Sequence, residues 1–367
     1  MKFNTLILTA LALTIAITGC EDPSQPDMDN ATRNKKKVAL GEQLFTAKSL
    51  SRNGTMSCAT CHDLTHAMVD VRDKNSTSFS FDGKSVGDRN APTAAYAMFS
   101  PRFHFDSGEG LYIGGQFLDG RELNLQGQAK GPFVNPIEMN MTVAEVVDKV
   151  ELNSTLSEPL IEIYGNNIFA DDNKAYNAIA DSIALFEMSP TFSPFDSKYD
   201  QYLSGKVTLT DLEQEGLKLF DGKALCSACH PATTDDGSHP LFTDYSYDNI
   251  GVPYNSELNV TRHKHGQKLP IDNGLGHTVS DTSLNGAFKV STLRNIAVTG
   301  PYMHNGLFKD LKTVVHFYNT RDTDVSWDKP EVPATINKSE LGNLGLTDHE
   351  EDAIVAFLET LTDKEFK

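Results

Sequence analysis

The sequence predicts a mainly α-helical chain built from two similar domains with long irregular loops. A five-residue pattern, Cys58-Ala59-Thr60-Cys61-His62, returns as Cys226-Ser227-Ala228-Cys229-His230. A short amphipathic segment ending in a Leu-Phe pair precedes each copy, at residues 40–45 and 215–220. Such a segment is typical of a helix that buries one face. No alternating strand pattern in the sequence is strong enough to define a sheet.

Further helix signals lie on both sides of the second copy. Thr210-Asp211-Leu212-Glu213 and Thr347-Asp348-His349-Glu350 are capping boxes, in which two side chains bond to the free backbone amides at a helix start. The second capping box marks the start of the last predicted helix of the second domain. The apolar residues of this helix follow helical spacing. We also predict helices over residues 142–152, 155–164 and 174–188, and irregular chain over residues 70–90, 231–285 and 319–345.

A chain of 367 residues is long enough for two domains. The repeated pattern places the first domain at residues 38–190 and the second at residues 207–367. Residues 191–206, which are rich in Ser, Pro, Phe and Asp, are the predicted linker.

The pattern C-x-x-C-H is the attachment motif for a c-type haem. The two thiols bind the porphyrin covalently, and the adjacent imidazole becomes a ligand of the iron. A zinc site would need four ligands from paired knuckles close together, and a redox dithiol would need a βαβ context; neither condition is met. The sequence therefore predicts two cytochrome c-like domains with two c-type haems, attached at Cys58, Cys61, Cys226 and Cys229 and bound through the iron ligands His62 and His230.

The fifth cysteine, Cys20, has a separate explanation. Residues 1–19 combine a charged start, a short apolar stretch and a small-residue end, which indicates a secretion signal rather than a membrane span. Ile17-Thr18-Gly19-Cys20 resembles the bacterial lipobox, in which the cysteine is lipidated; an ordinary cleaved signal is the alternative. Either case predicts a periplasmic protein. If Cys20 is lipidated, the lipid is the only predicted membrane anchor. Residues 20–37 have the composition of a flexible tether.

The formal net charge of −18 argues against nucleic acid as a partner, since nucleic acid would select a basic surface. The same charge permits docking of a basic electron-transfer protein by charge steering.

The sixth ligand of each iron decides between electron transfer and catalysis. Of nine methionines, only Met303 follows His230. A thioether ligand raises the potential of a haem, which suits a site that accepts electrons. The alternatives are that Met303 packs in the core, or that the ligand is His304, with His263, His265 and His277 as weaker candidates.

Several further stretches resemble the bacterial dihaem cytochrome c peroxidase family, which includes the MauG-type enzymes. The resemblance extends from about residue 38 to residue 362. It rests on Arg89-Asn90-Ala91-Pro92-Thr93, Phe117-Leu118-Asp119-Gly120-Arg121, Gln128-Ala129-Lys130-Gly131-Pro132, Pro136-Ile137-Glu138-Met139, Gly286-Ala287-Phe288-Lys289, Thr292-Leu293-Arg294-Asn295 and Pro301-Tyr302-Met303-His304.

The resemblance implies a role for each haem. The N-terminal haem is peroxidatic and the C-terminal haem transfers electrons, with Met303 as its ligand. Glu138 matches the catalytic glutamate of the family, with Gln128 and Pro132 beside it in the distal pocket. A carboxylate there can take a proton from one peroxide oxygen and return it to the other. Asn90 matches a residue that often helps to bind a calcium ion.

The sequence departs from the family at two positions. Many members carry a histidine that caps the peroxidatic iron, at a position near Asp82 here. Only His66 is available in that region, and it lies too close to His62 to reach the opposite face. We therefore predict an open N-terminal haem that needs no reductive activation. Leu118 replaces the usual tryptophan between the haems, and the only tryptophan is Trp327.

The predicted function is reduction of hydrogen peroxide to water with electrons from a small redox protein, a cytochrome c or a cupredoxin, which enter at the C-terminal haem. The resemblance also allows a homodimer. One alternative is a MauG-like enzyme that oxidises residues of a partner protein; MauG itself has a tyrosine at the other haem. The second alternative is a dihaem electron carrier, with His104 as the best candidate for a sixth ligand of the first iron.

Overall fold

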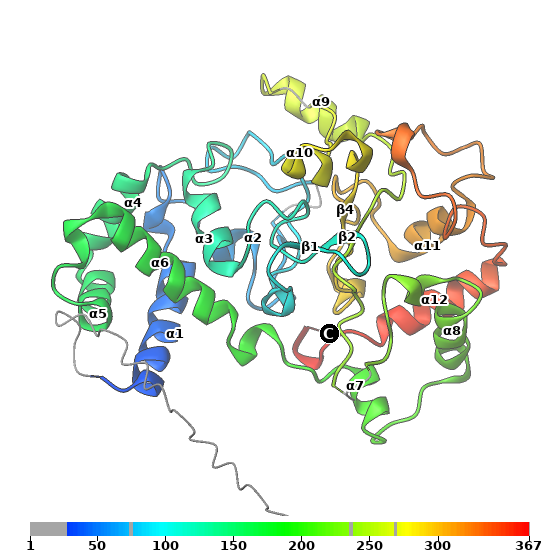
Figure 1. The fold of residues 1–367 in the computed structure, drawn as a ribbon, viewed down its shortest axis with the longest axis horizontal. Helices are drawn as coiled ribbons and strands as arrows, with labels where there is room; N and C mark the ends of the chain where they lie inside the picture. The colour runs from blue at the N-terminus through cyan, green and yellow to red at the C-terminus, as the bar shows by residue number, and fades with distance from the viewer. Residues whose placement is uncertain (1–27, 73–75, 235–237, 268–269, 367) are drawn as a thin grey trace, which may run out of the picture.

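The computed structural model describes residues 28–72, 76–234, 238–267 and 270–366. Two groups of helices lie side by side, with irregular chain and short strands between them (Figure 1). Each group has its own cluster of buried apolar side chains. The predicted mainly α-helical fold class is confirmed.

The first group surrounds the first Cys-x-x-Cys-His pattern. Its helices are α1 (Asn30–Thr46), α2 (Cys58–Cys61), α3 (Leu125–Val134), α4 (Val143–Glu151), α5 (Ser154–Tyr164) and α6 (Asp172–Glu187). The helices predicted over residues 142–152, 155–164 and 174–188 therefore form as α4, α5 and α6. Phe45 from α1 packs edge-on against Phe186 and Phe192, so the predicted Leu-Phe pair faces the core.

The second group contains the second pattern. Its helices are α7 (Lys198–Leu203), α8 (Asp211–Asp221), α11 (Leu311–Thr320) and α12 (Asp348–Glu359). Helices α9 (Ser256–Lys264) and α10 (Leu275–Val279) lie at the top of the view in Figure 1, between the two groups. Both predicted capping boxes are present, at the starts of α8 and α12. Phe220 of α8 packs against Phe357 of α12.

The repeated segments at residues 40–45 and 215–220 each contain one glycine that allows a close helix crossing. Helix α1 crosses α6 so closely that a Cβ on Gly41 would lie 2.0 Å from the Ser182 carbonyl oxygen. Helix α8 crosses α12 in the same way, and a Cβ on Gly216 would lie 1.9 Å from the Ala353 carbonyl oxygen. Each glycine precedes its Leu-Phe pair by three residues, so the same spacing builds the same crossing twice.

The prediction of a tether over residues 20–37 is wrong for its last part, because α1 begins at Asn30. Asp29 caps the helix by accepting a hydrogen bond from the Thr32 amide. Lys36 and Lys37 then form ion pairs with Glu162 of α5 and Asp181 of α6. In the sequence, these lysines are typical of a solvated tether. In the structure, they attach α1 to α5 and α6. The signal at residues 1–19 and Cys20 lie outside the described residues.

Three further expectations need correction. The loop predicted over residues 231–285 contains α9 and α10. The linker predicted over residues 191–206 contains α7, and its Tyr199 is buried in the second core. Short antiparallel strands also form: β1 (His104–Asp106) pairs with β2 (Leu111–Ile113), and β3 (Tyr247–Asp248) pairs with β4 (Phe288–Lys289). Strands of two or three residues are too short to leave an alternating pattern in the sequence. The domain boundaries themselves stay a prediction.

The end of the chain returns to the first group of helices. Phe366 packs in the first core. The Tyr96 hydroxyl donates to the buried Asp363 carboxylate at 2.7 Å, and Asn295 donates to the same oxygen at 2.9 Å. The C-terminal segment therefore joins the two groups.

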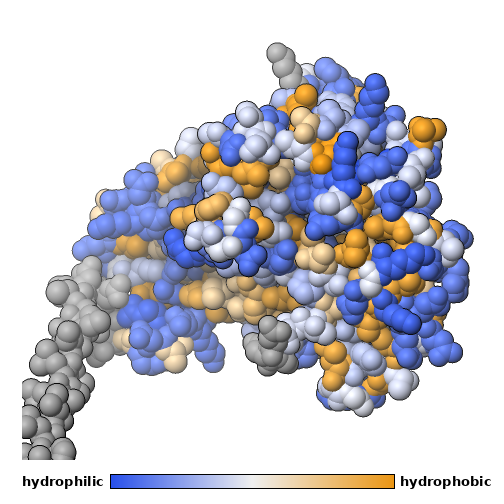
Figure 2. All heavy atoms as spheres, turned by 45° about the vertical axis from the view of Figure 1, so that its right-hand side comes forward, coloured by the Kyte–Doolittle hydropathy of each residue, from blue (hydrophilic) through white to orange (hydrophobic). Residues whose placement is uncertain are grey.

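Polar side chains cover most of the face in Figure 2, with apolar residues in separate patches. Within the described residues, every helix is too short or too polar to span a membrane.

Candidate functional site

A cavity lies beside each copy of the pattern. The first has a volume of about 620 Å³, and Cys61 and His62 form part of its lining. The second has a volume of about 290 Å³ and is lined by Cys226, Cys229 and His230. Such volumes are close to those of cofactor sites in proteins. Cys58 packs against the first core.

Each histidine of the pattern is held in the form that binds a metal. The Nδ1–H group of His62 donates to the Met68 carbonyl at 3.1 Å, and that of His230 donates to the Phe242 carbonyl at 2.7 Å. These bonds leave the Nε2 lone pair of each ring available for a metal. Burial lowers the pKa of both imidazoles, which favours the neutral, ligating form. Paired thiols and an oriented imidazole at an apolar cavity fit a covalently attached haem.

The three predicted distal residues line the same cavity as His62. Gln128 and Pro132 lie four residues apart on α3, so they share one helix face. Glu138 follows in the loop after α3 and also lines the cavity. The structure therefore brings together Gln128, Pro132, Glu138 and His62.

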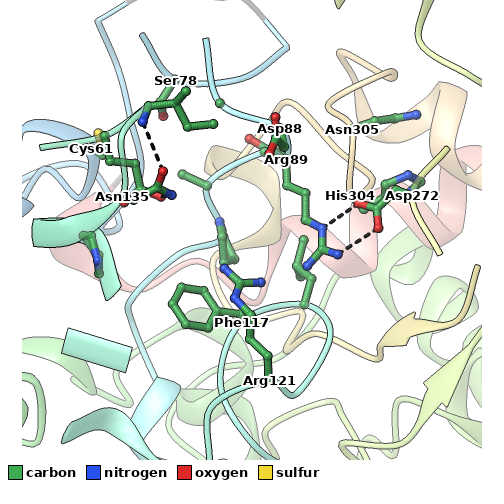
Figure 3. A pocket seen from close by; sticks show the side chains of 18 of the residues that line it. Cys61, Ser78, Asp88, Arg89, Phe117, Arg121, Asn135, Asp272, His304 and Asn305 are labelled. Atoms are coloured by element: carbon green, nitrogen blue, oxygen red, sulfur yellow. Dashed lines mark hydrogen bonds and ion pairs between the residues drawn. The ribbon is translucent and has the colours of Figure 1, made fainter. Parts of the chain in front are cut away.

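The environment of Glu138 controls its protonation. Burial raises the pKa of its carboxyl, while a hydrogen bond from Asn135 and the charge of Arg121 act to lower it. The Asn135 Nδ2 atom donates to Glu138 Oε1 at 2.7 Å. The Arg121 guanidinium lies 3.6 Å from the centre of the Phe117 ring. Figure 3 shows Phe117, Arg121 and Asn135 in the first cavity.

Neither His104, the candidate sixth ligand of the first iron, nor His66 lies in the first cavity. His66 is exposed and contacts Asp63 and Thr65. His104 is also exposed, and its Nδ1 donates to the Arg102 carbonyl. Asp82 closes a surface turn with Ser85. Apart from His62, the imidazoles in the described lining of the first cavity belong to the exposed His277 and to His304.

Among the candidate ligands of the second iron, Met303 and His304 line the second cavity with His230. The ring of His304 is engaged, since its Nε2 donates to Glu331 Oε2 at 3.2 Å and the ring stacks on Phe288. The neighbouring Tyr302 hydroxyl donates to the Ile296 carbonyl at 2.8 Å. His263 and His265 are exposed on and just after α9.

Seven of the described residues line both cavities, and we call this set the shared wall: Asn90, Pro92, Thr93, Leu118, Asp272, His304 and Glu331. Its carboxylates are paired. Arg89 binds Asp272 with two hydrogen bonds, at 2.6 and 2.8 Å, and the Asp272 amide donates to Glu331.

Asn90 ties the two halves of the molecule together at this wall. Its backbone amide donates to the His304 carbonyl at 2.7 Å, and its Nδ2 donates to the Pro301 carbonyl at 2.6 Å. Both of these bonds use nitrogen atoms of Asn90, whereas a calcium ion would bind oxygen atoms. No group of three or more His, Cys, Asp or Glu residues in the described parts of the chain is placed to hold a metal ion. Calcium binding at Asn90 stays a prediction.

Sequence reasoning gave no role to three residues of the first cavity. Asn135 and Arg121 act on Glu138, and only the three-residue spacing of Asn135 and Glu138 hinted at this contact. Glu187, at the end of α6, is buried, and its Oε2 has no hydrogen-bond partner among the described residues. Burial raises its pKa to about 8. Its position in the apolar run Ala184-Leu185-Phe186 was the available signal.

Comparisons with known proteins agree with this geometry. The family model for di-haem cytochrome c peroxidase matches residues 35–208. The methylamine utilization protein MauG of Paracoccus denitrificans is 39% identical over 380 residues, which cover 98% of this chain and 95% of that protein. The cytochrome c551 peroxidase of Nitrosomonas europaea is 31% identical over 361 residues, with 98% and 89% covered.

Among solved structures, the diheme peroxidase BthA of Burkholderia thailandensis has a TM-score of 0.82 and 31% identity. The similar region covers 90% of this chain and 86% of that one. Sequence and structure are thus similar over nearly the whole length of the chain. The chain belongs to the di-haem cytochrome c peroxidase family, and it is an enzyme of the dihaem peroxidase type that carries two c-type haems.

Proposed function

We propose that the chain reduces hydrogen peroxide to water with electrons from a small redox protein. The observation that supports this most strongly is the position of Glu138, a half-buried residue whose carboxyl lies in the same cavity as the free Nε2 of His62. Cys58 and Cys61 would hold the first haem, and Cys226 and Cys229 the second.

A haem bound at His62 would supply the redox centre for the reaction. The reduction consumes one peroxide, two electrons and two protons, and it yields two waters. Glu138 takes a proton from one peroxide oxygen and delivers it to the other. Burial helps because it brings the two protonation states of the carboxyl closer in free energy near neutral pH. Asn135 fixes the direction of the carboxyl through its hydrogen bond.

Electrons enter at the second cavity in this proposal, where His230 and Met303 are the ligands. The donor is a small basic protein such as a cytochrome c or a cupredoxin, because the chain carries a net charge of −18. The enzyme works in the periplasm, after a signal over residues 1–19 directs export and Cys20 receives a lipid.

A second candidate function is oxidation of residues in a partner protein. It is favoured by the 39% identity to MauG and by the exposed positions of His66 and His104, which leave the distal side of the first cavity to Gln128, Pro132 and Glu138. Met303 favours the peroxidase instead, because the hydroxyl of the adjacent tyrosine, Tyr302, is already bonded to Ile296.

The test is to mix the diferric protein, without prior reduction, with hydrogen peroxide and reduced cytochrome c. We expect rapid oxidation of the cytochrome, and a loss of about a hundredfold to ten-thousandfold in Glu138→Gln, the range for removing a general acid–base group. The control is Glu158→Gln, which changes an exposed carboxylate on α5. A long-lived oxidised haem spectrum without cytochrome oxidation would support the second candidate. No response of either kind would favour an electron carrier.

A further inference from the structure

The two haem cavities are separated by the shared wall, and electrons must cross it if they enter at one haem and are used at the other. Leu118 is part of this wall and has a saturated side chain. Asn90, Pro92, Thr93, Asp272 and Glu331 also lack conjugated rings. His304 is the one aromatic residue among the described residues that line both cavities.

The ring of His304 is fixed in this position. Its centre lies 3.9 Å from that of Phe288, and the two planes differ by 10°. Its Nε2 donates to Glu331, and both side chains are buried, with 6% and 7% of their areas exposed. Phe288 lines the second cavity. The two rings therefore form a rigid stack that begins at the second cavity and reaches the first.

The surroundings hold this stack from both sides. The Arg89 guanidinium, which lines the first cavity, lies 5.4 Å from the centre of the Phe288 ring. Arg89 is held in turn by ion pairs with Asp119 and Asp272. The backbone of His304 is bonded to Asn90, and it is directly continuous with Met303, a proposed iron ligand.

We propose that the His304 imidazole, stacked on Phe288, is the route by which electrons pass between the two haems. The inference rests on the proposed direction of electron flow. In each event one electron leaves the haem at His230 and Met303, which is oxidised, and reaches the haem at His62, which is reduced. The ring gains and loses nothing overall. Electron tunnelling weakens with distance and is faster through packed conjugated groups than across gaps, so a stacked ring compensates for the saturated side chain of Leu118.

Two substitutions separate the ring from its hydrogen bond. His304→Gln keeps an N–H donor for Glu331 and removes the ring, whereas His304→Phe keeps a ring and removes the donor. The holoprotein is reduced by one electron with a short light pulse. The rate of electron movement from the C-terminal to the N-terminal haem is then followed by their absorption bands. Both haem potentials are measured, and rates are compared at matched driving force.

We expect His304→Gln to slow this step at least about tenfold and His304→Phe to stay within about threefold of the wild-type rate. Leu118→Trp, added to His304→Gln, should restore the rate by returning an aromatic ring to the wall. The control is His263→Gln, since His263 is exposed on α9 and lines neither cavity. A wild-type rate in His304→Gln would overturn the proposal. Equal slowing in the Gln and Phe variants would also overturn it, because the hydrogen bond to Glu331 would then matter and not the ring.

This measurement needs neither peroxide nor a donor protein. A wild-type protein that fails to turn over peroxide, but whose haem-to-haem rate depends on the ring, would remove the proposed function and leave the electron route standing. Peroxide turnover together with a ring-independent rate would do the opposite.

Discussion

Glu138 is subject to opposing influences, and the neighbours of the carboxyl are as important as the carboxyl itself. Burial disfavours its ionised form, whereas the Asn135 amide and the Arg121 charge favour it. Neither neighbour belongs to the three distal residues that the sequence predicted. A buried acid without such partners is also present, since Glu187 has an oxygen with no hydrogen-bond partner in the described residues.

Removing the Asn135 amide should move the pH profile of the proposed reaction. In Asn135→Ala, Glu138 loses a bond that lowers its pKa, so its pKa rises. Since the reaction begins with a deprotonated Glu138, the acid limb of kcat/KM for peroxide should shift to higher pH, and activity at low pH should fall. The measurement is the pH dependence of peroxide turnover. The control is Asn166→Ala at an exposed position, and an acid limb that does not move would contradict the assigned role of Asn135.

At the scale of elements, the sequence predicted helices best where their stability is local. Capping boxes identified the starts of α8 and α12, because such a signal lies within one segment. Helix α9 and the strands β3 and β4 were missed, since their partners are distant in the chain. The first turns of α1 were missed for a related reason, as the ion pairs of Lys36 and Lys37 involve α5 and α6.

The candidate site also contains features that depend on local signals and features that depend on contacts between distant parts of the chain. The cysteines and histidines of the two patterns could be predicted because the motif is five residues long. Glu138 was identified through the spacing of a family, and its burial depends on the folded chain. The shared wall joins Asn90 to His304 across more than half of the sequence, and no local pattern predicts such a contact.

The two close helix crossings predict that their glycines are needed for stability. Gly41→Ala and Gly216→Ala should each lower the free energy of unfolding by about 1–3 kcal/mol, the usual cost of overpacking, even though alanine favours a helix. Urea unfolding followed by circular dichroism measures this. Gly127→Ala in α3 is the matched control, because its Cβ would meet the mobile end of the Glu122 side chain. Equal stability in all three variants would contradict the proposed crossings.

At the scale of the whole molecule, a buried network joins the two helix groups. Arg294 binds Asp200 with two hydrogen bonds, at 2.8 and 2.9 Å. The guanidinium also lies over the Tyr96 ring of the first group, at 5.1 Å. The network therefore holds the two helix groups together at a buried position.

This network should make the free energy of unfolding depend on pH in the acid range. Burial acts to raise the pKa of Asp200, but Arg294 outweighs it, and the pKa is lowered to about 2. An ionised Asp200 therefore stabilises the fold above about pH 4, and that stability is lost as the pH falls from about 4 to 2. In Asp200→Asn, stability at pH 7 should fall by about 3–5 kcal/mol, since Arg294 is left unpaired, and the decline between pH 4 and 2 should be less steep. Urea unfolding at each pH measures both effects, with Asp148→Asn on the exposed face of α4 as the control; an unchanged acid slope would contradict the assignment.

The contact between Tyr96 and Asp363 links the first group of helices to the end of the chain. In Tyr96→Phe, the carboxylate loses the hydroxyl donor at 2.7 Å but keeps Asn295. We expect the free energy of unfolding to fall by about 1–3 kcal/mol, the cost of a buried polar group that loses a partner. We also expect the two haem domains to unfold together in the wild type and at separate urea concentrations in this variant. Each domain can be followed by the absorption of its own haem. Tyr202→Phe is the control, because Tyr202 packs against the second core alone. A single transition with wild-type stability in Tyr96→Phe would show that the two domains are held together without this contact.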